Sequence, residues 1–235
     1  MNIILLEKGE TFLPSSDDRA KHIRKILHMS VGDTFRAGII NGYEGSARII
    51  SSDEKGIAIE FTPSSDASDL YPLTLIVAQV RPICMRRILR EAVSLGVEHI
   101  ILPVSDLGEK SYLSASLYTK GEYKDILLDG AMQSGATGVS RVTITENAEE
   151  AIAIARGDVH ILLDNAVGAV PLSEENLEKR SVVLAIGPER GWSERERNLF
   201  IDNGYRPMLL GKRILRTETA AVAGAAIALA RMKLL

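Results

Sequence analysis

The stretch VVLAIGPERGWSERE, residues 182–196, joins an apolar run to a glycine-containing loop and then to the start of a helix. The aliphatic run is typical of a strand buried in a parallel sheet. Ser193 and Glu196 have the spacing of a capping box, in which two side chains bond the amides at a helix start. The sequence therefore predicts strand, loop and helix in succession, which is where α/β proteins bind ligands.

The same alternation extends over the chain from residue 73 onward. It consists of short apolar runs, LTLIVAQV (73–80), HIILPV (99–104), VTIT (142–145), HILLD (160–164) and PMLL (207–210). Helices are expected between these runs. One is predicted over 84–95, a second ends near Ser134, and a third begins at Asn147, which has capping-box spacing with Glu150. A fourth runs from Ser193 to Gly204, and a fifth covers 220–230 with Thr217 as its N-cap. Short strands separated by helices imply an α/β fold whose parallel sheet is covered on both faces.

The first 65 or so residues have a different pattern. Two β-like runs, 34–40 and 43–50, flank Asn41-Gly42, a dipeptide that tolerates the positive φ angles of a tight hairpin. Another strand is expected over 57–62, and an amphipathic helix over 17–29. These elements predict a small, mainly antiparallel β domain with one helix.

A stretch rich in turn residues, 62–72, separates the two patterns. We place the domain boundary there. The prediction is a β domain over residues 1–68 and an α/β domain over residues 72–235.

Composition limits the classes of protein that fit. The 235 residues carry a net charge of -3, from 28 Lys and Arg against 31 Asp and Glu, which argues against binding nucleic acid by bulk charge alone. The longest strongly apolar stretch, Ala220–Ala230, falls short of the about 20 residues of a membrane span. The single cysteine, Cys84, cannot form an internal disulfide, and MNIILLEKGE has no basic leader, so we expect a cytoplasmic protein without a membrane segment.

Several common enzyme motifs are absent from the sequence. It has no phosphate loop, no G-x-G-x-x-G, no H-E-x-x-H and no paired C-x-x-C. His99 and His160 lie inside apolar runs, where a structural role outweighs metal binding. We therefore expect no metal site.

Two further segments bear glycine next to polar side chains. Residues 209–219 follow an apolar run and lead into the alanine-rich helix, with a density of charge that a simple connector does not require. Residues 130–138 place Gln133 at or just after a helix end. Each is also compatible with a solvated turn, and the loop at 187–191 with a tight strand-to-helix connection.

Basic side chains cluster in both predicted domains. Lysine and arginine contacts to phosphates position nucleic acid without reading its sequence, although helical charge runs are more often solvated faces. The candidates for RNA contact are Arg19, His22, Arg24 and Lys25 in the first domain and Arg81, Arg86 and Arg87 in the second.

The pair IGPERGWSERE (186–196) and LLGKRILRTETAA (209–221) closely resembles the signature of bacterial 16S ribosomal RNA (uridine-N3) methyltransferases of the SPOUT superfamily. The resemblance covers essentially the whole chain. HIRKILHMSVGD (22–33) is similar to the family's N-terminal PUA-like RNA-binding segment, and RRILREAVSLGVEHIILP (86–103) to its first βαβ unit.

This resemblance implies a parallel-sheet SPOUT domain knotted as a trefoil, preceded by a small antiparallel PUA-like β-barrel. It further implies a homodimer that binds S-adenosylmethionine and acts on RNA of the small ribosomal subunit, with Gln133 among the RNA contacts. The residues implied to bind the cofactor are Leu163, Gly187, Glu189, Gly191, Leu210, Gly211, Leu215 and Thr217.

The resemblance implies a reaction at uridine N3, whose proton must leave. Arg216 is assigned to stabilise the developing uridine anion, because arginine stays protonated and cannot act as a base. Glu189 or Glu218 is assigned to accept the proton, and the sequence does not choose between them.

The chain departs from the family pattern at several positions. Met132 and the segment 135–138 replace the usual Glu and a nearby Arg, Arg190 stands where a second glycine is common, and Ser94 replaces a frequent Glu. These departures leave two alternatives open: a SPOUT enzyme that modifies a different RNA base, and an inactive RNA-binding homologue. A third alternative is an α/β enzyme that uses the GPERG loop (187–191) to hold a phosphorylated metabolite.

Overall fold

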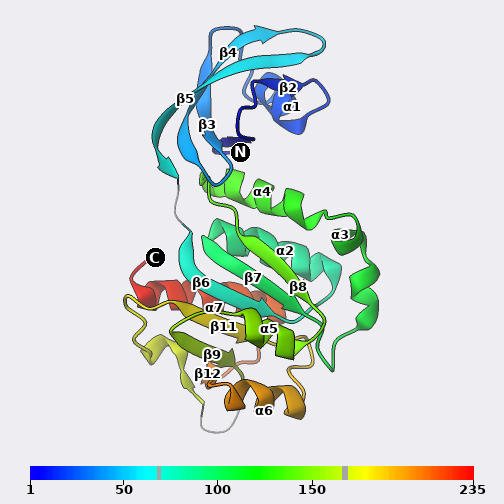
Figure 1. Cartoon of the computed structure of the whole chain (residues 1–235), viewed down its shortest axis with the longest axis vertical. Coiled ribbons are helices and arrows are strands. Elements are labelled where there is room, and N and C mark those ends of the chain that lie inside the picture. The colour runs from blue at the N-terminus through cyan, green and yellow to red at the C-terminus, as the bar shows by residue number, and fades with distance from the viewer. Residues whose placement is uncertain (68–69, 166–168) are drawn as a thin grey trace. The chain divides into compact units, whose positions relative to one another are not determined.

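The computed structural model describes residues 1–67, 70–165 and 169–235 and forms two compact units (Figure 1). The first unit comprises Met1–Asp69 and Ala131–Val139, and the second comprises Leu70–Gly130 and Ser140–Leu235. Within the described ranges, none of the helices combines the length and the hydropathy needed to cross a bilayer.

The first unit is a five-stranded sheet with one helix. Its elements are β1 (Ile4–Leu6), β2 (Phe12–Pro14), α1 (Asp18–Lys25), β3 (Thr34–Ile39), β4 (Tyr43–Ser52) and β5 (Gly56–Ala67). The strand order is β1-β3-β4-β5-β2, and all pairs are antiparallel except β1 with β3. The predicted mainly antiparallel domain is confirmed.

The predicted hairpin forms at Asn41-Gly42. Asn41 has a φ of 52°, and the Gly42 N–H donates to the Ile39 carbonyl at 2.8 Å. The predicted helix over 17–29 is too long, because α1 ends at Lys25 and Ile26 is 65% exposed. The chain turns away at His28, whose φ is 53°.

Residues 62–67 of the turn-rich stretch do not form a loop, as the sequence suggested, but belong to the second half of β5, whereas residues 68–69 lie outside the described residues. Pro63 lies opposite Gly45 of β4, between two register shifts. A Cβ at Gly45 would lie 2.1 Å from the Thr62 carbonyl oxygen, so the glycine is what allows the two strands to approach.

A segment distant in sequence completes the first unit. The Met132 carbonyl accepts the Asn2 N–H at 2.8 Å, and the Thr137 carbonyl accepts the Asn41 N–H at 2.9 Å. The Asn41 side chain in turn accepts the Val139 N–H at 2.8 Å. Residues 131–139 are therefore tied to β1 and to the β3–β4 hairpin by backbone hydrogen bonds.

The second unit is an α/β domain with a parallel sheet, as predicted. Its strands are β6 (Tyr71–Val77), β7 (Val97–Pro103), β8 (Arg141–Thr145), β9 (Val159–Leu163), β10 (Val170–Pro171), β11 (Val182–Ile186) and β12 (Arg206–Leu209). They pair in the order β10-β12-β9-β11-β6-β7-β8, and every pairing is parallel. The helices are α2 (Pro82–Ser94), η1 (Lys110–Ser114), α3 (Ser116–Thr119), α4 (Tyr123–Ser134), α5 (Ala148–Ile154), η2 (Leu172–Glu174), α6 (Glu194–Asp202) and α7 (Thr217–Met232). The end of α4, from Ala131 onward, belongs to the first unit.

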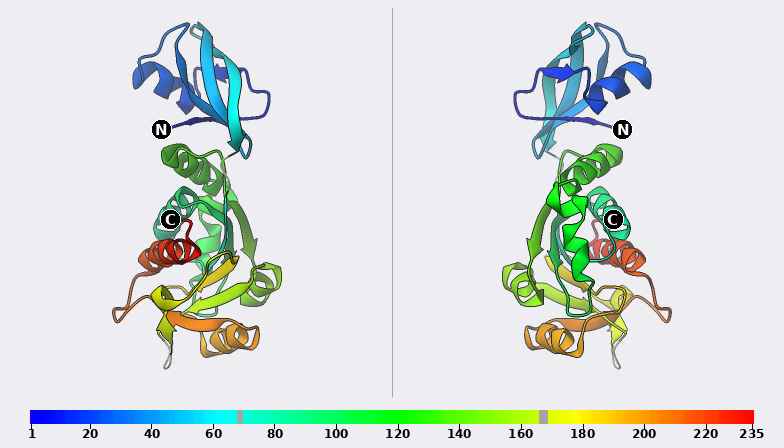
Figure 2. Two further views of the ribbon diagram at one scale, coloured as in Figure 1. Left: turned by 90° about the vertical axis from the view of Figure 1, so that its left-hand side faces the viewer. Right: turned by 90° about the vertical axis from the view of Figure 1, so that its right-hand side faces the viewer.

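Helices cover both faces of this sheet. Figure 2 shows α2 and α7 on one face and α5 and α6 on the other. Successive side chains of β6 point to opposite faces. Leu75 accordingly packs with Ile88 of α2 and Ala221 of α7, whereas Ile76 joins Phe200 in the core under α5 and α6.

Helix starts follow the predicted caps at two of three positions. Ser193 and Glu196 form a complete capping box at α6. Asn147 caps α5 by accepting the Glu150 N–H at 2.9 Å, although the Glu150 carboxylate bonds the Glu146 N–H instead of closing the box. Thr217 is not the N-cap of α7, because the helix starts one residue earlier than expected and Arg216 is the cap.

Candidate functional site

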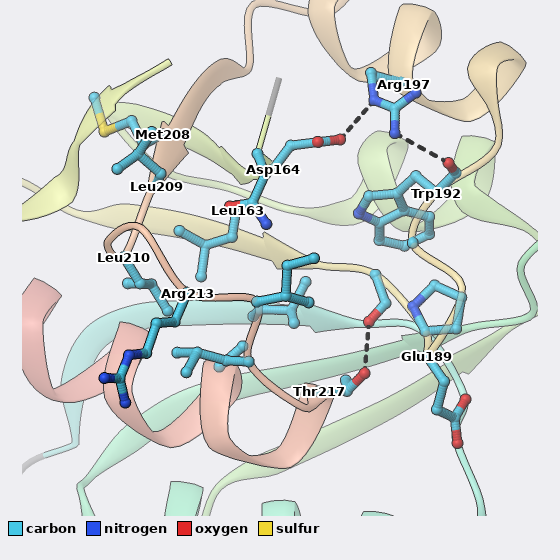
Figure 3. A pocket seen from close by; sticks show the side chains of 18 residues that line it. Leu163, Asp164, Glu189, Trp192, Arg197, Met208, Leu209, Leu210, Arg213 and Thr217 are labelled. Atoms are coloured by element: carbon cyan, nitrogen blue, oxygen red, sulfur yellow. Dashed lines mark hydrogen bonds and ion pairs between the residues drawn. The ribbon is translucent and has the colours of Figure 1, made fainter. Parts of the chain in front are cut away.

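A cleft lies at the carboxyl ends of β9, β11 and β12, three neighbouring strands of the sheet (Figure 3). Carboxyl ends of parallel strands meet at one edge, so the loops that follow them converge there. The lining residues are Leu163, Asp164, Asn165, Ile186, Gly187, Pro188, Glu189, Gly191, Trp192, Arg197, Met208, Leu209, Leu210, Arg213, Ile214, Leu215, Thr217 and Ala220.

The two glycine-bearing loops are joined directly. The Thr217 hydroxyl, in the first turn of α7, donates to the Gly187 carbonyl after β11 at 3.2 Å. Thr217 is 5% exposed, so this hydrogen bond is largely shielded from water. The hydroxyl thus connects the loops instead of capping its own helix.

The loop after β11 is tightly folded. Gly191 has a φ of 70°, and its N–H donates to the Pro188 carbonyl at 2.9 Å. A Cβ at Gly187 would lie 3.0 Å from the Trp192 backbone nitrogen. Glycine at position 187 therefore keeps this turn close and leaves backbone, not side chain, at the cleft.

An ion pair between α6 and the end of β9 forms part of the cleft lining. The Arg197 Nε of α6 lies 2.5 Å from the Asp164 Oδ2 that follows β9, and its Nη2 donates to the Trp192 carbonyl at 3.4 Å (Figure 3). The buried Trp192 Nε1 has no hydrogen-bond partner among the described residues. None of these three residues is among those predicted from the sequence, although an Asp directly after an apolar strand is a usable signal for Asp164.

A second cavity adjoins the first. It is lined by Arg81, Cys84, Pro188, Glu189, Ile214, Leu215, Arg216, Thr217 and Glu218. Five of these residues, Pro188, Glu189, Ile214, Leu215 and Thr217, also line the cleft. The three predicted catalytic residues, Arg216, Glu189 and Glu218, therefore lie together in the second cavity, and only Glu189 lines both.

Cys84 and Glu218 interact in this cavity. Burial, followed by the charge of Glu218 and a hydrogen bond with it, raises the pKa of the Cys84 thiol. On the other side, the Arg81 N–H donates weakly to the Glu189 carboxylate at 3.4 Å. A hydrogen bond with Tyr112 and then the charge of Glu189 raise the pKa of the Arg81 guanidinium.

The residues predicted to bind a cofactor converge on the cleft. Leu163, Gly187, Glu189, Gly191, Leu210, Leu215 and Thr217 line it. Gly211 is not among the lining residues but follows Leu210 directly, with a φ of 148°. In the ranges that the structure describes, no group of three or more His, Cys, Asp or Glu could hold a metal ion.

The predicted RNA contacts fall into two groups, and the first is engaged within the protein. Arg19 pairs with Glu10 and Asp17, both at 2.7 Å. Arg24 donates to the carbonyls of Asp53 and Gly56, and Arg86 pairs with Glu122. These three arginines therefore stabilise their own units.

The second group consists of residues outside these ion pairs and carbonyl contacts, and most of them are exposed. Lys25, Arg87 and Gln133 are exposed, and Arg81 lines the second cavity. His22 has a buried Nε2 without a hydrogen-bond partner in the described part of the chain. Gln133 belongs to the first unit, with the basic residues of α1, although it is distant from them in sequence.

Comparison with known proteins identifies the family. The model of the "RNA methyltransferase domain" matches residues 67–229, and that of the "RNA methyltransferase PUA domain" matches residues 16–62. Ribosomal RNA small subunit methyltransferase E of Treponema pallidum is 38% identical over 98% of this chain and 91% of the relative. The chain belongs to this methyltransferase family. The corresponding methyltransferase E 1 of Borreliella burgdorferi is 30% identical over 99% of both chains.

Solved structures agree with this methyltransferase fold. Ribosomal RNA small subunit methyltransferase E of Neisseria gonorrhoeae, solved with bound S-adenosylmethionine, superposes with a TM-score of 0.82 at 23% identity, over 98% of this chain and 97% of the other. A methyltransferase from Legionella pneumophila, also solved with that cofactor, gives 0.83 at 20% identity over the same shares. The resemblance to the methyltransferase family and the two-part fold it implied are thereby confirmed.

Proposed function

We propose that this protein transfers a methyl group from S-adenosylmethionine to N3 of a uridine in 16S ribosomal RNA. The observation that carries the proposal is the convergence of the loops 187–191 and 210–217 on one cleft, in a chain of the methyltransferase E family. The uridine N3 target comes from the resemblance of these loops to the family signature.

The cleft fits S-adenosylmethionine in three respects. Leu163, Ile186 and Leu210 offer apolar contact for a flat purine. Gly187 leaves a place that a Cβ would crowd, and the buried Trp192 Nε1 lacks a partner among the described residues. A nucleoside ligand supplies both an apolar ring and hydrogen-bond acceptors, so it matches this combination.

When bound, S-adenosylmethionine supplies an electrophilic methyl group whose bonding electrons remain with sulfur. The protein's contribution is then to hold the uridine in line with that methyl group, which alone lowers a barrier by several kcal/mol. In the proposed reaction Arg216, which lines the second cavity, stabilises negative charge that develops on the uridine.

The test is methylation of small-subunit RNA by the purified protein with labelled cofactor. Nucleoside mass spectrometry should find 3-methyluridine in 16S RNA. A different methylated nucleoside would favour a SPOUT enzyme with another target base, and cofactor binding without any methylated RNA would favour an inactive RNA-binding homologue.

Arg216→Ala is expected to reduce methyl transfer at least 100-fold while changing the cofactor dissociation constant less than threefold, because Arg216 lines only the second cavity. Single-turnover transfer and isothermal titration calorimetry measure the two quantities. Lys212→Ala is the control, since Lys212 is exposed and lines neither cavity. Equal transfer by Arg216→Ala and the wild type would remove the assigned role.

The proposal includes a homodimer. Ile83 and Ile214 are 63% and 88% exposed, and apolar side chains this exposed are typical of a surface covered by a partner. Sedimentation equilibrium should give twice the chain mass of 25.6 kDa.

A further inference from the structure

The cleft and the second cavity share part of their lining, and we expect them to bind different molecules. Glu189, Ile214 and Leu215 are among the residues that face both cavities. Methyl transfer requires donor and acceptor atoms about 3–3.5 Å apart before reaction. If the cleft holds the methyl donor, the acceptor must enter the space directly beside it, which is the second cavity.

The side chains of the second cavity match a pyrimidine base. Arg81 and Arg216 bring guanidinium donors, which suit the O2 and O4 carbonyls of uracil or a neighbouring phosphate. Leu215, which lines both cavities, provides apolar surface for the ring. Glu189 and Glu218 are the two carboxylates among the residues that line this cavity, and a carboxylate oxygen can serve as the acceptor of a proton in a reaction.

The geometry distinguishes these two carboxylates. Glu189 lines both cavities, and its carboxylate points toward the Arg81 N–H of the second cavity, 3.4 Å away (Figure 3). Glu218 lines only the second cavity, where its negative charge acts on the Cys84 thiol. Of the two carboxylates, that of Glu189 therefore belongs to the residue that borders the cleft as well as the second cavity.

We infer that the second cavity binds the target pyrimidine and that Glu189 accepts its N3 proton, an inference that rests on the proposed function. The N3–H bond breaks toward a Glu189 carboxylate oxygen, and the electron pair left on N3 forms the new bond to the methyl carbon as the carbon–sulfur bond breaks and its electron pair stays on sulfur. The proton then passes from Glu189 to water. Glu218 and Cys84 are positioning residues that shape the pocket.

Cys84 offers a direct probe of the pocket, because it is the only cysteine of the chain. N-ethylmaleimide, applied at alkaline pH, should place an adduct in the second cavity. The alkylated protein should lose methyl transfer at least 100-fold and keep its affinity for S-adenosylmethionine within threefold. The control is Cys84→Ser, which cannot be alkylated: N-ethylmaleimide should leave its methyl transfer at the rate that this variant shows without the reagent. If alkylation left methyl transfer unchanged, or abolished both methyl transfer and cofactor binding, the inference that cofactor and pyrimidine occupy separate adjoining cavities would be wrong.

The matched variants Glu189→Gln and Glu218→Gln test the proton acceptor. Glu189→Gln should slow single-turnover transfer by about 10²–10⁴-fold, the usual contribution of a general base, and Glu218→Gln by less than tenfold. Because Glu189→Gln lacks the base, its rate of methyl transfer should depend on the fraction of uridine that has already lost its N3 proton. Its remaining rate should therefore rise nearly tenfold per pH unit between pH 7 and 9, more steeply than that of the wild type.

Two failures are distinguishable in this experiment. If the wild type binds cofactor and RNA but forms no 3-methyluridine, the proposed function is wrong. If the wild type is active and Glu189→Gln keeps the wild-type rate and pH profile, or Glu218→Gln shows the larger loss, only the assignment of Glu189 is overturned.

Discussion

At the scale of single residues, Gly187 is where the cleft leaves least room for a side chain. An added Cβ would lie 3.0 Å from the Trp192 nitrogen and 3.2 Å from the Gly191 Cα. Both neighbours are backbone atoms, so the loop itself would have to shift. We expect Gly187→Ala to weaken cofactor binding roughly tenfold, or about 1.4 kcal/mol, measured by isothermal titration calorimetry.

The control for this prediction is a glycine whose replacement is costly for a different reason. Gly121 has a φ of 70°, no atom within 4 Å of its added Cβ, and no place in the cleft wall. Gly121→Ala should cost about 1–2 kcal/mol of stability, because of its left-handed backbone, and leave the affinity for the cofactor unchanged. Equal affinities in both variants would contradict the steric role of Gly187.

At the scale of elements, α6 is fixed by a buried carboxylate. Glu196 is fully buried and accepts the N–H groups of Ser193 and Asp106, both at 2.9 Å. Glu196→Gln replaces one acceptor oxygen by an amide donor, so one of these N–H groups loses its partner. We expect a loss of about 1–3 kcal/mol in the free energy of unfolding by urea. Glu194→Gln, exposed on the same turn, should change it by less than about 0.5 kcal/mol.

The elements of this chain were predictable where their signal is local. The strand β11, the capping box of α6 and the Asn41-Gly42 hairpin each follow from neighbouring residues, and the structure contains all three. Thr217 shows the opposite case. Its hydroxyl satisfied the local rule for an N-cap, but the Gly187 carbonyl, 30 residues away, lies within its reach.

At the scale of the whole molecule, the strand order was not predictable by the same reasoning. β6 comes first in the second unit but lies between β11 and β7 inside the sheet. The assignment of residues 131–139 to the first unit likewise depends on hydrogen bonds to residues about 100 positions away. The adjoining cavities also depend on segments distant in sequence. The trefoil knot stays a prediction of the family resemblance.

The second unit contains a buried histidine whose hydrogen bonds fix its charge. His99 of β7 is 4% exposed, and its Nδ1 faces the Arg141 Nη2 of β8 at 3.0 Å. Arginine only donates, so Nδ1 must accept and the ring is neutral, with Nε2 donating to the Thr143 hydroxyl at 2.9 Å. Burial, and then the charge of Arg141, lower the pKa of His99 to about 4.

From the lowered pKa of His99 we expect the second unit to lose stability in acid. In the unfolded chain His99 binds a proton below pH about 6.5, whereas in the folded chain it binds one only below pH about 4. Between these two values the unfolded state binds more protons, so the free energy of unfolding decreases as the pH falls. We expect a loss of about 2 kcal/mol between pH 7.5 and 5 from this group, measured by urea unfolding at each pH. His99→Gln cannot be protonated and should show a flatter pH dependence, even if it is less stable throughout. An unchanged slope in that variant would assign the acid sensitivity to other groups, such as His160, whose pKa burial also lowers.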